Sequence, residues 1–162
     1  MASIPQLPES LAPLIKPLFD TLPIDSAMSQ LVVSSPAGGQ AFEQVKRITT
    51  HGEIRKRPAL GAGLWLYVDD LERSHGLCQA IKDSTGSFWH GIMHRREGDF
   101  SNSHYWFRNT GEHAAMVAIH DYDPHHFIDD VERAHQGSGD VETLVELQRR
   151  EWSALMQWCA AQ

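Results

Sequence analysis

The sequence predicts an all-α protein, a single-domain irregular helical bundle with a proline-punctuated N-terminal arm. Apolar residues recur at helical spacing in successive segments, and clusters of turn-forming residues separate those segments. The chain has 162 residues, of which 41% are hydrophobic, enough for one ordinary domain with its own core. We expect residues 1–36 to form an arm packed on a helical domain of residues 37–162.

The arm and the segment that follows it predict short helices. Leucines at positions 7, 11, 14 and 18 keep a helical spacing, but Pro13 and Pro17 should interrupt a continuous helix, so we expect short helical turns. After a break at residues 36–39, the apolar residues Phe42, Val45 and Ile48 recur every three positions. This spacing predicts a short amphipathic helix that ends near residue 52.

A long apolar segment from Leu60 to about Lys82 predicts the central helix, and it ends at the turn-forming residues 83–87. His75 falls in the middle of its apolar arc, so we expect this imidazole to be buried. Two further helices, from about Ser87 to Glu97 and from about Ser101 to Asn109, predict a helical hairpin that turns at residues 98–99 and ends at residue 111.

The last third of the sequence predicts two more helices, Phe127 to Ala134 and Val141 to Ala160. Glycines at 137 and 139 separate them, and Asp140 is suited to cap the second one. Two apolar segments, residues 31–33 and 113–122, fit either a strand or a helix.

Composition excludes some function classes. A formal charge of -7 argues against a general nucleic-acid or anionic-membrane binder, because such proteins rely on a basic surface. No apolar run is long enough for a membrane span, and the N-terminus does not resemble a signal peptide. Cys78 and Cys159 lie on apolar helical faces, as buried free thiols do, so we expect a cytoplasmic protein. Ten histidines, seven of them within residues 90–126, suggest a functional site.

Polar residues on apolar helix faces predict a buried pocket. They are His75 on the central helix, Arg96 on the next helix, and Gln148 with Glu151 on the last helix. An unpaired buried guanidinium costs several kcal/mol, so we expect Arg96 to pair with Glu151. Taken singly, each of these residues is more often structural. If they converge, we expect Asn102 and Tyr105 of the hairpin beside them.

A second candidate site is a metal centre formed by His90, His94 and Glu97. Their i, i+4, i+7 spacing places two imidazoles and a carboxylate on one helical face, where they could hold Zn or Fe. The alternative is an ordinary polar face, because the stripe lacks the HExxH pattern. Two Glu-x-x-His steps, residues 72–75 and 132–135, also allow a di-iron centre completed by Glu97 and Glu151. We disfavour it because so short a pattern arises easily in a chain rich in Glu and His, and because Glu72 lies about 60° off the core direction of its helix.

Two segments, GLWLYVDDLERSHGLCQ at residues 63–79 and WHGIMHRREGDFSNSHYWFR at residues 89–108, resemble an uncharacterised, mostly bacterial family of small proteins. The resemblance covers about a quarter of the chain and includes most of the polar residues named above. It implies that these positions belong to a shared design, but it supplies no reaction. His104 departs from the family pattern, in which we expect a small residue, and is therefore less attractive as a ligand.

These observations favour an enzyme slightly. In that hypothesis His75, or a divalent metal held by His90, His94 and Glu97, performs acid-base or Lewis-acid chemistry on a small anionic substrate. One of three arginines, Arg95, Arg96 or Arg108, would orient the substrate. The alternative is a non-catalytic small-ligand-binding or assembly protein in which the polar cluster is structural and Trp106 and Phe107 form a contact surface. No nucleophile elbow or phosphate loop is present.

Overall fold

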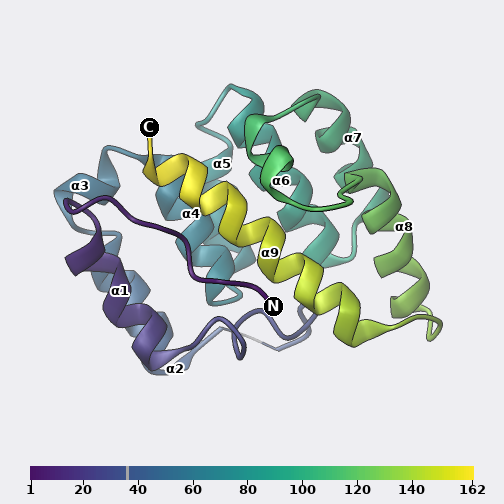
Figure 1. The fold of residues 1–162 in the computed structure, drawn as a ribbon, viewed down its shortest axis with the longest axis horizontal. Helices are drawn as coiled ribbons and strands as arrows, with labels where there is room; N and C mark the ends of the chain where they lie inside the picture. The colour runs from purple at the N-terminus through teal and green to yellow at the C-terminus, as the bar shows by residue number, and fades with distance from the viewer. Residues whose placement is uncertain (36) are drawn as a thin grey trace.

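The computed structural model describes residues 1–35 and 37–162, and these residues form helices and connecting turns without a β-strand (Figure 1). The all-α prediction is confirmed. In chain order the helices are α1 (Ala12–Thr21), α2 (Gly39–Ile48), α3 (Gly52–Arg55), α4 (Pro58–Tyr67), α5 (Leu71–Cys78), α6 (Ser84–Glu97), α7 (Phe100–Thr110), the 3-10 helix η1 (Ala114–Ala118), α8 (Pro124–His135) and α9 (Val141–Ala160). Among these helices, none has the length and apolar character that crossing a membrane requires.

Helix α4 forms the centre of the molecule. All of its residues from Leu60 to Tyr67 are buried, as expected for a helix that is apolar on every side. The long C-terminal helix α9 runs across it in Figure 1, and the Trp152 indole N–H of α9 donates a hydrogen bond to the Gly63 carbonyl at 2.8 Å. Gly63 permits this close packing, because a Cβ at this position would lie 2.8 Å from the ring of Trp89 on α6.

The predicted central helix is in fact two helices, α4 and α5, so the expectation of one helix from Leu60 to Lys82 is wrong. The chain breaks at Asp69, whose backbone is left-handed with φ at 65°. Asp70 then caps α5, because its carboxylate accepts the backbone N–H of Arg73 at 3.0 Å. Because of this break, the apolar face of α4 does not continue onto α5. His75 is therefore partly exposed, and the expectation that it is buried is wrong.

Helices α6 and α7 form the predicted hairpin. Gly98 ends α6 in the left-handed conformation with φ at 86°, and the Asp99 carboxylate caps α7 by accepting the backbone N–H of Asn102 at 3.2 Å. The two helices approach closely at Gly91, whose carbonyl accepts a hydrogen bond of 2.6 Å from the Ser103 hydroxyl. This hairpin carries most of the candidate site residues.

The N-terminal arm differs from its prediction, because α1 continues through Pro17. Pro13 stands in the first turn, where its missing N–H is not needed. Pro17 is on the exposed side of the helix, so the carbonyl that it leaves without a partner faces water. Leu11, Ile15 and Leu18 point the other way and are buried in the main core.

The C-terminal helices α8 and α9 agree with the prediction. Asp140 caps α9 by accepting the backbone N–H of Thr143 at 3.2 Å, and Gly137 and Gly139 take positive φ values in the loop before it. Neither of the two segments that fit a strand or a helix, residues 31–33 and 113–122, forms a strand. Residues 114–118 form the 3-10 helix η1, and residues 31–33 have no regular structure.

Candidate functional site

The interior contains a sealed ion pair between Arg95 of α6 and Glu151 of α9. The guanidinium donates two parallel hydrogen bonds of 2.9 and 2.7 Å to the carboxylate, and both side chains are fully withdrawn from solvent. The Tyr122 hydroxyl donates to the same carboxylate, and the guanidinium lies 4.1 Å from the centre of the Phe127 ring. Burial raises the pKa of Tyr122 well above its ordinary value, so it stays a hydrogen-bond donor.

Arg96 does not pair with Glu151, which corrects the sequence prediction. Its guanidinium instead donates to the Asp69 carboxylate at 2.6 Å and to the Leu66 carbonyl at 2.9 Å. Leu66 lies in the last turn of α4, where helix carbonyls lack intrahelical partners and a cation is favourable. Burial lowers the pKa of Arg96, while the neighbouring Asp69 opposes that shift. The break between α4 and α5 therefore supplies the partner of Arg96.

Gln148 of α9 fastens the N-terminal arm to the core. Its amide donates to the backbone carbonyls of Met28 and Gln30 at 2.9 and 3.0 Å. Together with the two buried arginines it donates to interior oxygens and has no contact with solvent, although Gln148 Oε1 and the Nε atoms of both arginines have no partner among the described residues. Of the expected pocket, Arg96 and Gln148 both donate to the Gln30 carbonyl, whereas Glu151 pairs with Arg95 and His75 is not part of this group. These contacts are those of a structural network.

His75 lies elsewhere, in a cluster with the two histidines that we predicted as metal ligands. The ring centre of His75 on α5 is 5.2 Å from that of His90 and 5.4 Å from that of His94, both on α6. The rings of His90 and His94 are 5.9 Å apart and nearly parallel. The structure therefore combines one residue of the predicted polar pocket with two of the predicted metal centre.

The tautomer of neutral His90 is fixed by its backbone contact. Its Nδ1 lies 3.0 Å from the Gly86 carbonyl oxygen, which can only accept, so Nδ1 carries the proton and Nε2 keeps a free lone pair. Trp106 of α7 stacks on the imidazole with ring centres 3.9 Å apart and fixes its orientation. Burial lowers the pKa of His90 to about 4, so the ring is neutral near pH 7.

His94 has the same arrangement with a carboxylate in place of the carbonyl. Its Nδ1 lies 2.6 Å from the Glu97 carboxylate, so Nδ1–H donates, and Nε2 is the nitrogen that a metal would take. The side-chain amide nitrogen of Asn102 lies 3.3 Å from that Nε2. Glu97, predicted as a ligand, is therefore bonded to His94 and positions its ring.

The three imidazoles have nearly the spacing that one metal ion requires. With Zn–N distances of about 2.0–2.1 Å, three rings arranged tetrahedrally around an ion would have centres about 5 Å apart. The observed ring-centre separations of 5.2, 5.4 and 5.9 Å are slightly wider, and the nitrogens of the three rings do not all lie within 4.8 Å of one another, so binding requires the rings to move.

A rival ligand group lies beside the imidazoles. Within the described ranges, the ligand atoms that already lie within 4.8 Å of one another belong to His94, Glu97 and Asp99. Both carboxylates of that group already accept hydrogen bonds. Glu97 accepts from His94, and Asp99 caps α7 by accepting from the backbone N–H of Asn102. We therefore favour the three imidazoles over this group.

A hollow of about 490 Å³ opens beside His75, His90 and Trp106, the size of a small-molecule site. Its lining is completed by Cys78, Gln79, Ile81, Lys82 and Ser87. Lys82 is the cation of this lining, whereas the predicted Arg95 and Arg96 are sealed in the core. Tyr105 and Arg108 are exposed residues of α7 and do not line the hollow.

Two other sequence hypotheses are corrected. Glu151 is held by Arg95 and Tyr122, and the side chain of Glu72 is exposed, so the carboxylates of a di-iron centre do not meet. Phe107 is buried against Phe88, so it cannot form a contact surface with Trp106.

The sequence does not favour His104 as a ligand, but in the structure it forms a second imidazole pair with His125. Its Nδ1 lies 2.8 Å from Nδ1 of His125, and its Nε2 is 3.0 Å from the Asp129 carboxylate. The only sequence signal for this pair was the high density of histidines.

Comparison of the chain with protein-family models, curated proteins and solved structures finds no match.

Proposed function

We propose that this protein binds a divalent transition metal, Zn or Fe, through His75, His90 and His94, and that it acts on a small anionic molecule in the adjoining hollow. Such a metal polarises a carbonyl or phosphoryl oxygen and generates a nucleophile from bound water. Three protein ligands leave a coordination position open for a substrate, as in catalytic sites. A cytoplasmic location belongs to this proposal and is supported by two buried free thiols.

The single observation that carries the proposal is the hydrogen bond that Nδ1 makes in both His90 and His94. In each ring Nδ1 is bonded to an oxygen that can only accept, the Gly86 carbonyl or the Glu97 carboxylate. Metal-ligating histidines almost always donate their second N–H to such an oxygen, which fixes the ring and raises its basicity. In two imidazoles one helical turn apart, Nε2 is therefore the nitrogen left for a metal, and at His94 the ion would take the place of the Asn102 amide.

The remaining residues have defined roles in this proposal. His75 contributes the third nitrogen from α5, a separate helix, so the centre joins two elements. Trp106 holds the His90 ring flat. Lys82 lies on the lining of the hollow, where its ammonium group favours a negatively charged substrate over a neutral one.

The proposal is tested with Co²⁺, whose visible absorption reports the number and kind of its ligands. The metal-free protein is titrated with Co²⁺ and separately with Zn²⁺. We expect one equivalent to bind, and His75→Ala, His90→Ala and His94→Ala each to weaken binding at least about ten-fold. Glu97→Gln should weaken it by about ten-fold while the protein still binds one ion.

The matched control is the other imidazole pair, altered as His104→Ala with His125→Ala, which should leave the affinity unchanged. A second control is Asp99→Asn. If Asp99→Asn abolishes binding and His75→Ala does not, the ion sits on the acidic group and the proposal is wrong. Circular dichroism of each variant separates lost ligands from lost folding.

The substrate part is tested on the Co²⁺-loaded protein with acetate and inorganic phosphate. Each anion should shift the Co²⁺ absorption bands as it enters the open coordination position. Lys82→Gln should raise the anion concentration needed by several-fold, because it removes the cation of the lining. Bands that do not respond to either anion would rule out the open position.

A further inference from the structure

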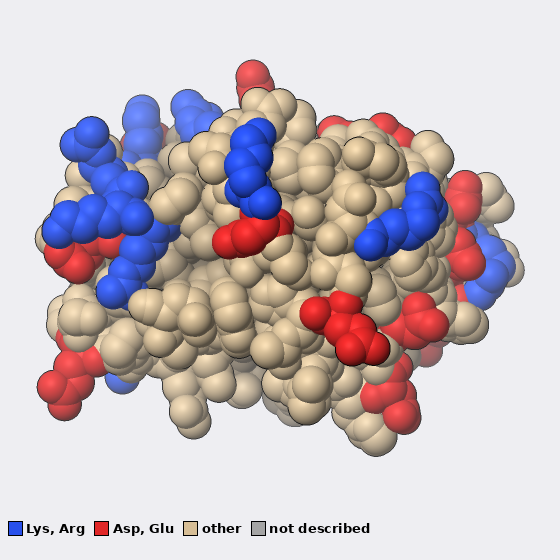
Figure 2. Space-filling model, turned by 90° about the horizontal axis from the view of Figure 1, so that it is seen from above, with Lys and Arg blue, Asp and Glu red and all other residues tan. Residues whose placement is uncertain are grey.

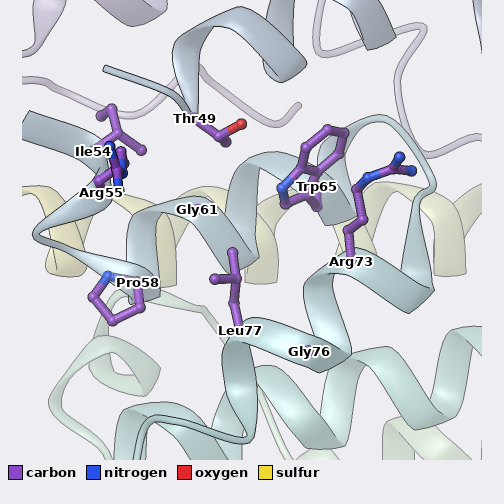
Figure 3. A pocket seen from close by; sticks show the side chains of 9 residues that line it. All are labelled: Thr49, Ile54, Arg55, Pro58, Gly61, Trp65, Arg73, Gly76 and Leu77. Atoms are coloured by element: carbon purple, nitrogen blue, oxygen red, sulfur yellow. The ribbon is translucent and has the colours of Figure 1, made fainter. Parts of the chain in front are cut away.

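A second hollow of about 500 Å³ lies on the other side of α5, between α3, α4 and α5. Figure 3 shows the side chains that line it. They are Thr49, Ile54, Arg55, Pro58, Gly61, Trp65, Arg73, Gly76 and Leu77. Most of this lining is apolar, and Figure 3 shows the two arginines on opposite sides of the hollow.

Arg73 is held in place before any ligand arrives. Its guanidinium donates to the Asp70 carboxylate at 2.6 Å and lies 5.1 Å from the centre of the Trp65 ring and 5.5 Å from that of Phe42. These contacts leave half of the side chain exposed. An arginine fixed in this way can form further hydrogen bonds to an anion with little loss of entropy.

Arg55 stands on the opposite side, at the end of α3, and has no ion-pair partner among residues 1–35 and 37–162. It belongs to a basic stretch, Arg55, Lys56 and Arg57, that follows Lys46 and Arg47 of α2. Figure 2 shows Lys and Arg side chains gathered at one end of the molecule, the end where α3 lies in Figure 1. In a chain of net charge -7, this local excess of positive charge attracts an anion.

Gly76 adds an independent observation. It occupies an interior position of α5, where glycine is less stable than alanine by about 1 kcal/mol. Its φ is not in the left-handed region, and a Cβ built on it meets no atom within 4 Å. Neither backbone conformation nor packing therefore requires glycine here. The absent side chain leaves open space on the wall of the hollow.

We propose that this hollow binds a small carboxylate with a flat apolar body, its carboxylate held by Arg55 or Arg73 and its body lying along Trp65 and Leu77. Guanidinium groups pair with planar carboxylates through two parallel hydrogen bonds. The volume is within the range of small-molecule sites, and a bicyclic aromatic acid fits inside it. This site is separate from the imidazole cluster, which lies on the opposite face of α5.

The probe for the test is 2-naphthoate, titrated into the full-length protein and followed by calorimetry. We expect saturable binding of one molecule. Gly76→Leu should abolish binding, because its side chain enters the space that the ligand needs. Since Arg55 and Arg73 lie on opposite sides of the hollow, one of Arg55→Gln and Arg73→Gln should weaken binding about ten-fold, the effect of losing a charge-assisted hydrogen bond, and the other should weaken it less.

Three controls give the test its discrimination. Lys56→Gln changes the neighbouring cation, which pairs with Glu53 outside the hollow, and should leave the affinity unchanged. The neutral analogue 2-naphthamide should bind at least about ten-fold more weakly than 2-naphthoate. His75→Ala should leave 2-naphthoate binding intact, so the result is independent of the metal proposal.

Three outcomes would overturn the proposal. One is equal binding of 2-naphthoate to Gly76→Leu and to the unaltered protein, which would place the ligand elsewhere. The second is equal affinity for 2-naphthoate and 2-naphthamide, which would show that the arginines do not recognise the charge. The third is the absence of saturable binding of 2-naphthoate to a protein that cooperative thermal unfolding shows to be folded.

Discussion

Glu151 of α9 accepts two parallel hydrogen bonds from Arg95 of α6, and neither side chain is exposed to solvent. This pair joins the helix that carries the imidazoles to the helix that crosses the molecular centre. A buried ion pair is weak evidence for stability, because desolvation offsets most of the attraction. Its value lies in specificity, since each charge is tolerable in the core only when α6 and α9 are correctly docked.

A double-mutant cycle tests this interpretation. Glu151→Leu leaves the Arg95 charge without its counter-ion and should lower the free energy of unfolding by about 3–5 kcal/mol. Arg95→Met should act similarly, because it strands the carboxylate. The double variant Arg95→Met with Glu151→Leu should recover most of the loss, except for about 1–3 kcal/mol from the Tyr122 hydroxyl that loses its acceptor. Urea denaturation measures all four proteins, and additive losses would contradict the coupling.

Two helical glycines should respond in opposite directions to alanine. At Gly91 a Cβ would lie 2.5 Å from the buried ring of Phe107, which cannot move without disturbing the hairpin. Gly91→Ala should therefore destabilise the protein by about 1–3 kcal/mol despite the better helix propensity of alanine. Gly76→Ala meets open space and should stabilise it by up to about 1 kcal/mol. Thermal unfolding of the two variants checks the signs, and a neutral Gly91→Ala would show that the hairpin can separate.

The helices were predictable where one side is apolar and a cap marks the end. Helix α9 shows this, with Asp140 at its start. The break at Asp69 was missed because α4 is apolar on every side, so its residues do not define a phase that could be seen to change. The signal that could have found it is Asp70, a capping residue directly before Leu71, with Glu72 in the following turn.

The site was predictable in its composition but not in its pairing. Helix α6 is buried on nearly every side from Phe88 to Arg96, so a helical wheel cannot tell which of two adjacent arginines meets Glu151. The wrong phase of His75 follows from the missed break. His90 and His94 were found because their spacing is local to one helix. Contacts between helices, such as His75 with His94, depend on tertiary packing, which periodicity does not contain.

His113 should make stability depend on pH. Its Nδ1 accepts the Ala115 backbone N–H at 3.1 Å, and its Nε2–H then donates to the Thr85 hydroxyl at 2.9 Å, so the buried ring is neutral. Burial lowers the pKa of His113, an effect that Asp83 partly opposes. The unfolded chain therefore binds a proton more readily, and this contribution to stability is present above about pH 6.5 and declines as the pH falls toward the folded pKa.

The measurement is the free energy of unfolding between pH 7.5 and pH 5, compared in the unaltered protein and in His113→Asn. The variant should be less stable at pH 7.5 and should lose less stability on acidification. The difference in slope is at most about 1.4 kcal/mol per pH unit for one group. His120→Asn, which alters an exposed imidazole, is the control and should keep the original slope. Identical slopes for all three proteins would refute the role of His113.

The two thiols should be unreactive until the protein unfolds. Cys78 and Cys159 are buried and free, and burial raises the pKa of each to about 12. Since the thiolate is the reactive form, both should resist an aromatic disulfide reagent at pH 8 for as long as the fold is intact. In denaturant, two equivalents should react within minutes, as ordinary thiols do. Addition of an exposed cysteine, as Ser101→Cys, provides a matched thiol that should react at once in the native protein. If Cys78 reacts as fast as this added thiol, the hollow beside His75 opens far enough to admit the reagent.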